Sequence, residues 1–134
     1  MSRRTDIRDA IVAKLQGLGL GAPVGTWTGD PEEFNEDESF PSVWVLYAGA
    51  QFGEWRTLGT SNPVYERAFG FAVFVAATSE TEALGILEAI EQGLPGTLTV
   101  GSDKRRVELD GNEELIAVEL GRYLYGQRYR VPDP

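Results

Sequence analysis

The chain has 134 residues, of which 42% are hydrophobic and 25% are charged, a composition typical of one globular domain and unlike that of disordered or fibrous proteins. The 21 acidic residues outnumber the 12 basic ones and give a formal net charge of −9, which disfavours duplex DNA as a ligand because proteins that bind it normally carry a basic surface. Cysteine and histidine are both absent, which excludes disulfides, thiolate metal sites and the commonest catalytic base, so the composition argues against an enzyme.

We expect a single domain over residues 1–134, since this length is too short for two domains of ordinary size. The longest apolar stretch, residues 69–77, is far below the roughly 20 residues that a membrane-spanning helix needs. The charged start of the chain leads into no apolar signal core. We therefore expect a soluble protein that is made in the cytoplasm and contacts no membrane.

Apolar residues at helical spacing predict a first helix over residues 5–17, with Thr5 as its N-cap. These apolar residues are Ile7, Ile11, Val12, Leu15 and Leu18. Glycines at positions 17, 19 and 21 follow the helix. Because a phosphate-binding glycine loop leads from a strand into a helix, we interpret this run as the end of the helix.

A short edge strand is expected over residues 22–28, and a polar loop over residues 29–39. The loop carries six acidic residues: Asp30, Glu32, Glu33, Glu36, Asp37 and Glu38. Hard cations bind clustered carboxylates, but a calcium loop has acids at alternate positions followed by glycine, and Phe34 interrupts that pattern here. We therefore predict no metal ion and interpret the loop as a solvated face, a partner-facing surface or the wall of a lumen.

Two strands are expected in the middle of the chain. Residues 42–47 are apolar on both faces, which is typical of a central strand, and residues 64–77 have large apolar side chains on one face and small residues on the other. The glycine-rich residues 49–63 are predicted to form a long connection between these strands. Phe52 and Trp55 lie in that connection, where a monomer has little use for large apolar side chains, so we expect them to contact a partner.

A capping box over Ser79–Glu82 predicts a second helix, which continues over residues 80–93. The apolar residues of this helix and of the middle strands are expected to form one core. The predicted core residues are Val43, Val45, Phe71, Val73, Leu84, Leu87 and Ile90.

The remaining sequence predicts short strands near 97–100 and 105–109, a turn at residues 110–112 and a last strand over residues 115–131. The element order is therefore α-β-β-β-α-β-β-β. This order indicates an α+β fold in which two helices pack on a mostly antiparallel sheet.

The last strand is expected to contain a break or bulge at Gly121 or Gly126 and to end in a flexible tail at residues 131–134. Its tyrosines alternate with its arginines, and both residue types are enriched in protein interfaces. A half-exposed sheet face is the alternative interpretation, because tyrosine also favours strands in general. The residues that we expect at an oligomer or partner interface are Phe52, Trp55, Arg56, Arg122, Tyr123, Tyr125, Arg128, Tyr129 and Arg130.

The chain contains neither the Gly-x-Ser-x-Gly nucleophile motif nor a Walker phosphate loop. We therefore predict no catalytic residue, no bound metal and no cofactor.

Six features of the chain follow one another in an order known from phage tails. They are the charged helix start Arg3–Arg8, the acidic loop running into Phe40–Val45, the segment Tyr47–Phe52, the apolar strand 66–76, the helix 80–93 and the closing segment Leu120–Tyr125. In this layout the chain resembles the tail terminator proteins of long-tailed phages, including the lambda type, and small tail-completion proteins of Mu-like contractile phages. The resemblance covers most of the chain, while the connection 53–65 and the tail 128–134 depart from it.

The resemblance implies a ring, usually a hexamer, that caps the tail tube, stops its polymerisation and docks to the head-side connector. It places the protein at the head-proximal end of the virion tail, after synthesis in the host cytoplasm, with no sequence-specific nucleic acid as partner. A ring of such acidic chains repels DNA in its lumen. The alternatives are another neck or head–tail connector protein, a small non-enzymatic adaptor and, third, a metal-dependent hydrolase that uses the acidic loop.

Overall fold

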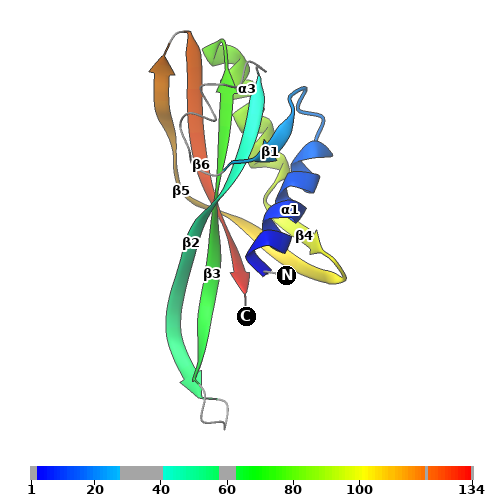
Figure 1. The fold of residues 1–134 in the computed structure, drawn as a ribbon, viewed down its shortest axis with the longest axis vertical. Coiled ribbons are helices and arrows are strands. Elements are labelled where there is room, and N and C mark those ends of the chain that lie inside the picture. Colours follow the sequence, from blue (N-terminus) through cyan, green and yellow to red (C-terminus); the bar gives the residue numbers. More distant parts are fainter. Residues whose placement is uncertain (1–2, 28–40, 58–62, 120, 134) are drawn as a thin grey trace.

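The chain folds as two helices and one six-stranded, mostly antiparallel sheet, which confirms the α+β class. The computed structural model describes residues 3–27, 41–57, 63–119 and 121–133 (Figure 1). Its elements are α1 (Arg3–Gln16), β1 (Val24–Thr26), β2 (Ser42–Thr57), β3 (Pro63–Ala77), α3 (Glu80–Gly93), β4 (Gly96–Val100), β5 (Asp103–Glu119) and β6 (Arg122–Asp133). The strands lie side by side in the order β1-β2-β3-β6-β5-β4, and only the β1–β2 pair is parallel.

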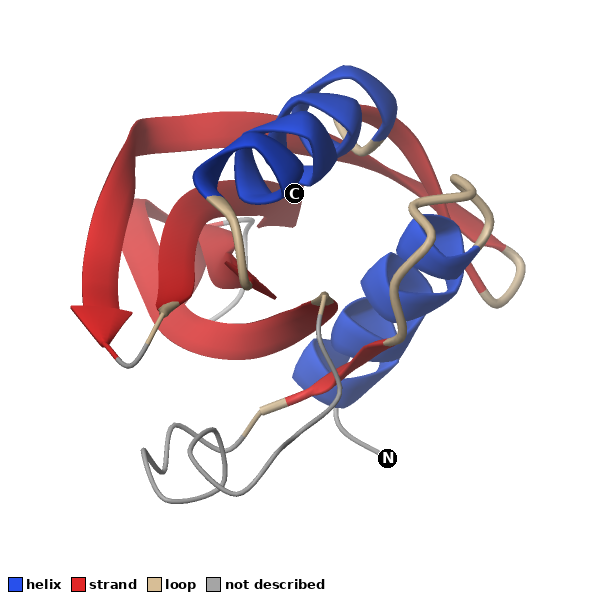
Figure 2. Ribbon diagram, turned by 90° about the horizontal axis from the view of Figure 1, so that it is seen from above, coloured by secondary structure: helices blue, strands red, loops and turns tan. Residues whose placement is uncertain are grey.

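Both helices pack against the inner face of the curled sheet (Figure 2). Helix α1 buries Ile7, Ile11 and Leu15, which recur at the spacing of one helical face. Helix α3 buries its own stripe, and both stripes join one cluster with the inward-facing residues of β2, β3 and β6. Neither described helix is long and apolar enough to cross a membrane.

The predicted core is confirmed at Val43, Val45, Phe71, Val73, Leu87 and Ile90. It is wrong at Leu84, whose side chain is 38% exposed. The buried stripe of α3 runs through Ala83, Ile86, Leu87 and Ile90, so Leu84 lies beside the stripe rather than on it.

The two helix starts differ in how well the sequence predicts them. Helix α3 begins as expected, because the Ser79 side chain accepts a hydrogen bond from the backbone N–H of Glu82 at 3.2 Å. Helix α1 begins at Arg3, so the predicted N-cap at Thr5 is wrong and Thr5 lies in the first turn.

The predicted connection over residues 49–63 is wrong, because most of it extends the two middle strands. Strand β2 runs to Thr57 and β3 begins at Pro63, and their pairing continues from Ser42↔Ala76 to Thr57↔Pro63. Irregularities between Tyr47 and Gly49 and between Phe52 and Trp55 absorb residues that do not fit the ladder. Gly49 has a φ of +108°, a conformation that favours glycine.

A two-stranded arm projects from the sheet at the far end of β2 and β3 (Figure 1). The pairing of β3 with β6 ends at Arg67↔Asp133, so among the described strands residues 52–57 pair only with β3 and residues 63–66 pair only with β2. We call these residues the β2–β3 arm. An isolated pair of strands is marginally stable in water, which makes the arm a candidate for contact with another molecule.

Strand β5 crosses the predicted turn at residues 110–112 without reversing direction. These residues lie at an irregularity between Asp110 and Glu114, where Gly111 has a φ of +73°, so the pattern that predicted a turn marks a bulge. The chain reverses at Gly121 instead, with a φ of +76°. The flexible tail is also a wrong prediction over residues 131–133, because β6 pairs with β3 through Asp133 and Val131 is fully buried.

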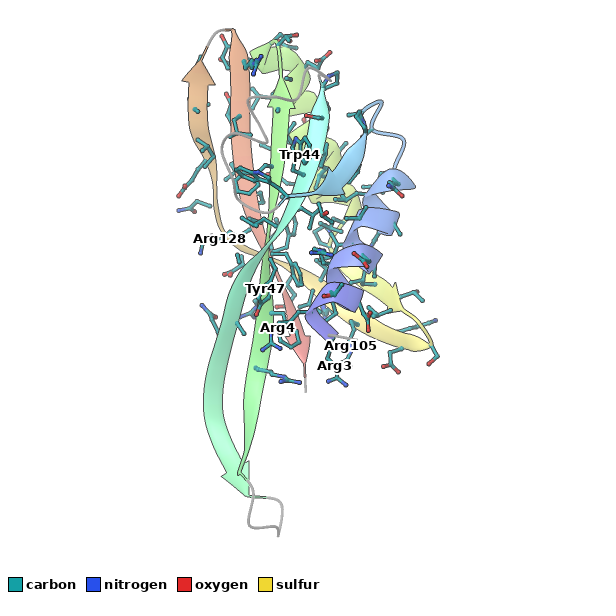
Figure 3. The ribbon with its side chains drawn as sticks, viewed as in Figure 1. Arg3, Arg4, Trp44, Tyr47, Arg105 and Arg128 are labelled. Carbon is teal, nitrogen blue, oxygen red and sulfur yellow. The ribbon has the colours of Figure 1, made fainter. Side chains whose placement is uncertain are left out.

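Two basic side chains fasten α1 to its surroundings. The Lys14 ammonium donates hydrogen bonds to the backbone carbonyls of Leu94 and Thr97, both at 2.8 Å, and so ties α1 to the end of α3 and to β4. Burial lowers the pKa of Lys14. Arg4 donates from Nε to the Tyr47 hydroxyl at 2.9 Å and lies over the ring of Phe69 (Figure 3).

Candidate interaction surface

One edge of the sheet is covered along only part of its length. Strand β4 pairs with β5 from Asp103 to Val107, and from there to Glu119 no other described strand flanks β5 on the side away from β6. We call residues 108–119 the β5 edge. Unpaired N–H and C=O groups along such an edge are a template for pairing with a further strand.

The β5 edge carries half-exposed apolar side chains on both of its faces. The exposed fractions are 50% for Leu109, 54% for Leu115, 47% for Ile116 and 53% for Val118. Leu115 and Val118 lie opposite Tyr125 and Tyr123, which pack against the core. Leu115 and Val118 therefore lie on the inner face of the sheet, at its edge, where they are half exposed. A row of large apolar residues on an open edge marks an interaction site or a site of aggregation.

Acidic residues flank this apolar row on both sides. The acidic residues of the β5 edge are Glu108, Asp110, Glu113, Glu114 and Glu119. Glu113 forms a side-chain hydrogen bond with Glu91 of α3. Burial, this hydrogen bond and the charges of Glu113 and Glu88 raise the pKa of Glu91 to about 7, so the Glu91 carboxyl group is protonated below that pH.

A second open edge lies at the opposite side of the sheet. Strand β1 pairs with β2 only from Val43 to Val45, so no described strand flanks the outer side of residues 46–57. We call these residues the β2 edge, and they include one side of the arm. Its sequence is Leu-Tyr-Ala-Gly-Ala-Gln-Phe-Gly-Glu-Trp-Arg-Thr, in which Glu54 and Arg56 are the only charged residues.

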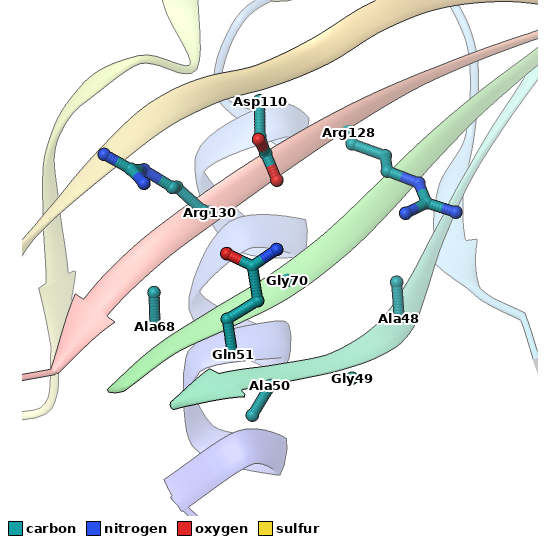
Figure 4. Close-up of a pocket in the computed structure, with 9 residues that line it drawn as sticks. All are labelled: Ala48, Gly49, Ala50, Gln51, Ala68, Gly70, Asp110, Arg128 and Arg130. Carbon is teal, nitrogen blue, oxygen red and sulfur yellow. The ribbon is translucent and has the colours of Figure 1, made fainter. Parts of the chain in front are cut away.

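The outer face of the sheet has a small hollow of about 100 Å³ between these two edges (Figure 4). Small residues form its floor, and the Cβ of any larger residue at Gly70 would lie 3.1 Å from the carbonyl oxygen of Gly49. Arg128 and Arg130 of β6 line one side. Arg130 forms an ion pair with Glu108 at 2.8 Å, whereas the Arg128 side chain has no ion-pair partner among the described residues.

The predicted alternation of β6 is confirmed, but the two faces have unequal roles. Arg128 and Arg130 are exposed on the outer face, while Tyr123 and Tyr125 are half-buried on the inner face. Tyr129 is fully buried among core residues, and burial raises its pKa, so the expectation that it contacts a partner is wrong. Tyrosine at a strand position does not distinguish a core site from a half-exposed one.

The structure gives different amounts of information on the other predicted interface residues. Phe52, Trp55 and Arg56 belong to β2 and lie on the arm, where the pairing of β3 with β6 ends. Arg122 begins β6 beside the turn at Gly121. The six acidic residues from Asp30 to Glu38 lie outside the described residues.

The β5 edge itself was not among the predicted interface residues. Its signal in the sequence is the run Leu115–Val118, in which four consecutive apolar residues follow two glutamates. A strand with one buried face alternates, and an unbroken run is typical of a central strand covered on both faces. An unbroken run on an edge strand instead indicates a surface that is covered from outside.

Within the described ranges, no group of three or more acidic residues is placed so that it could hold a metal ion. No protein-family model matches the chain, and no curated protein matches its sequence.

Proposed function

We propose that the chain is a structural virion protein, a phage tail terminator that assembles into a ring of about six copies. The ring caps the tail tube, ends its polymerisation and joins it to the head-side connector. It acts without a catalytic residue, a metal ion or a cofactor.

The half-exposed apolar row of the β5 edge is the observation that supports this proposal most. Four large apolar side chains on an uncovered strand disfavour an isolated monomer, because their exposed surface is poorly solvated. The β2–β3 arm is a second extension, in which β2 and β3 pair with no further described strand. A protein with two such features on different sides is suited to contact more than one neighbour.

The charge of the chain fits a ring through which DNA passes. Each copy contributes a formal charge of −9, so a closed ring presents a strongly acidic surface that repels the phosphate backbone. The resemblance in element order to phage tail terminators supplies the specific role. Another neck or head–tail connector protein, and a small non-enzymatic adaptor, are the alternatives to it.

The test is the mass and shape of the purified full chain, by light scattering and negative-stain electron microscopy, alone and with isolated tail tubes. We expect rings of about six copies that bind one end of the tube. Rings that bind the connector and not the tube indicate a different neck protein. A monomer that binds neither contradicts the proposal and favours an adaptor.

A further inference from the structure

We propose that the copies join head to tail, through pairing of the β5 edge of one copy with the β2 edge of the next. This inference rests on the proposed ring and identifies the surfaces that build it. The sheets of neighbouring copies then form one continuous sheet, in which backbone hydrogen bonds provide affinity and the side chains of both edges provide specificity.

The β5 edge needs a strand as its occupant, because it exposes backbone groups and apolar side chains together. Leu115 and Val118 face the inner side, whereas Ile116 lies near Gly126 and Phe74 on the outer side. A helix or loop laid on one face would cover only half of this apolar surface. A strand added at the edge brings neighbours to both faces at once.

Charge decides which strand fits. If two copies paired through their β5 edges, two strand segments with five acidic residues each would lie side by side, and like charges on opposed strands are destabilising. The β2 edge has no net charge over residues 46–57, and its sequence contains the aromatic residues Phe52 and Trp55. The acidic residues therefore discriminate against self-pairing and leave the neutral edge of a second copy as the compatible partner.

Register within the sheet shows that the two open edges begin at the same level. Gly49 of β2 pairs with Gly70 of β3, Gly70 pairs with Arg130 of β6, and Arg130 pairs with Glu108 of β5. From this level β2 is open toward the arm and β5 is open toward the other end of the sheet. Joining them requires a shift along the strands from one copy to the next. Closed sheets with tilted strands require such a stagger.

The two edges are different surfaces of one chain, so their contact is heterologous. Such a contact closes into a ring of more than two copies when the rotation between copies permits, whereas a self-complementary contact stops at a dimer. Head-to-tail edge pairing is thus the type of contact that the proposed ring needs.

Cysteine cross-linking tests the pairing directly, because the natural chain contains no cysteine. One set of full-length variants carries a single cysteine on the β2 edge, Ala48→Cys or Gln51→Cys, at exposed positions. The other set carries one on the outer face of the β5 edge, Ile116→Cys or Ala117→Cys, so that both cysteines lie on the same face of the continuous sheet, and a tag that changes its mass. Thr99→Cys, at an exposed position of β4, replaces the β5 variant in the matched control. Mixed pairs are mildly oxidised and separated on a non-reducing gel.

We expect at least one mixed pair to give a disulfide-linked product of one β2 variant and one β5 variant, severalfold more abundant than the Thr99→Cys control, since opposed strand positions meet disulfide geometry. Cross-links between two β5 variants would overturn the head-to-tail arrangement. Rings in the microscope with cross-linking at control level would overturn the edge pairing and leave the proposed function standing. A wild-type chain that stays monomeric would overturn both.

Discussion

Strands β3 and β5 are both long, and both contain apolar residues on the two faces of the sheet, yet their surroundings are opposite. Phe69, Phe71, Val73 and Val75 of β3 are fully buried, whereas Leu109, Leu115, Ile116 and Val118 of β5 are each about half exposed. Strand β3 lies between β2 and β6, and its inner face is covered by the helices. The apolar residues of β3 thus serve the core of the single chain, and those of the β5 edge serve a contact outside it.

Two leucines of helix α3 give the same contrast between a buried and a half-exposed apolar residue. Leu87 is 1% exposed and belongs to the core, while Leu84, one turn earlier, is 38% exposed. We expect Leu87→Ala to lower the free energy of unfolding by about 2–5 kcal/mol, because it leaves a cavity between helix and sheet. The matched Leu84→Ala is expected to lower it by less than about 1 kcal/mol. Urea unfolding followed by circular dichroism measures both, and equal losses would mean that the helix packs in another phase.

The hydrogen bonds of Lys14 hold α1 against the junction of α3 and β4, and we expect them to make the second-largest contribution to stability. Lys14→Met removes two hydrogen bonds to the carbonyls of Leu94 and Thr97 while keeping much of the aliphatic stem. We expect a loss of about 1–2 kcal/mol in the free energy of unfolding. Lys104, the chain's other lysine, is exposed, so Lys104→Met is expected to leave the free energy of unfolding unchanged within measurement. Equal free energies of unfolding for the Lys14 and Lys104 variants would show that the Lys14 contacts do not stabilise the fold.

Glu91 of α3 contacts Glu113 of the β5 edge, and this contact makes the free energy of unfolding depend on pH. The folded-state pKa of Glu91 is about 7 against an ordinary 4.5, so the folded state binds more protons between these values. The free energy of unfolding therefore falls as pH rises through that window. We expect Glu91→Gln to flatten this fall and to raise the melting temperature at about pH 8 relative to wild type.

Thermal melts from about pH 5 to about pH 8 check this prediction, with the exposed Glu114→Gln as the control. A wild-type melting temperature that rises across this window, or a Glu91→Gln variant with the same slope as wild type, would contradict the assigned carboxyl contact.

The parts of the fold that follow from local patterns could be predicted from the sequence. The side chain of Ser79 caps the helix that follows it, and the apolar stripe from Ala83 to Ile90 meets the alternating strand at Phe71, so both are recoverable from spacing alone. Pairing partners are not local. The same Asp-Gly-Asn signal predicts a turn at residues 110–112, and the neighbouring strand β6 converts it into a bulge.

The candidate site was harder to predict for the same reason. Whether Leu115 or Tyr129 is exposed depends on which strand lies beside it, and the sequence gives no direct sign that β4 ends its pairing at Val107. The Tyr–Arg alternation predicted two faces correctly but did not show which face the helices cover. The glycines at 49 and 53 indicated a loop, whereas strand β2 runs through both positions: Gly49 pairs with Gly70, and Gly53 lies in the irregularity between Phe52 and Trp55.

The double variant Leu115→Ser and Val118→Ser tests the central claim most directly, when its mass by light scattering and its melting temperature are compared with those of wild type. Both side chains are half exposed in the single chain, so we expect an unchanged monomer fold with a melting temperature close to that of wild type. The variant is expected to be a monomer at concentrations where the wild-type chain forms rings. Rings that persist in the variant, or a wild-type chain that is itself monomeric, would contradict the claim that the apolar residues of the β5 edge bind a second copy.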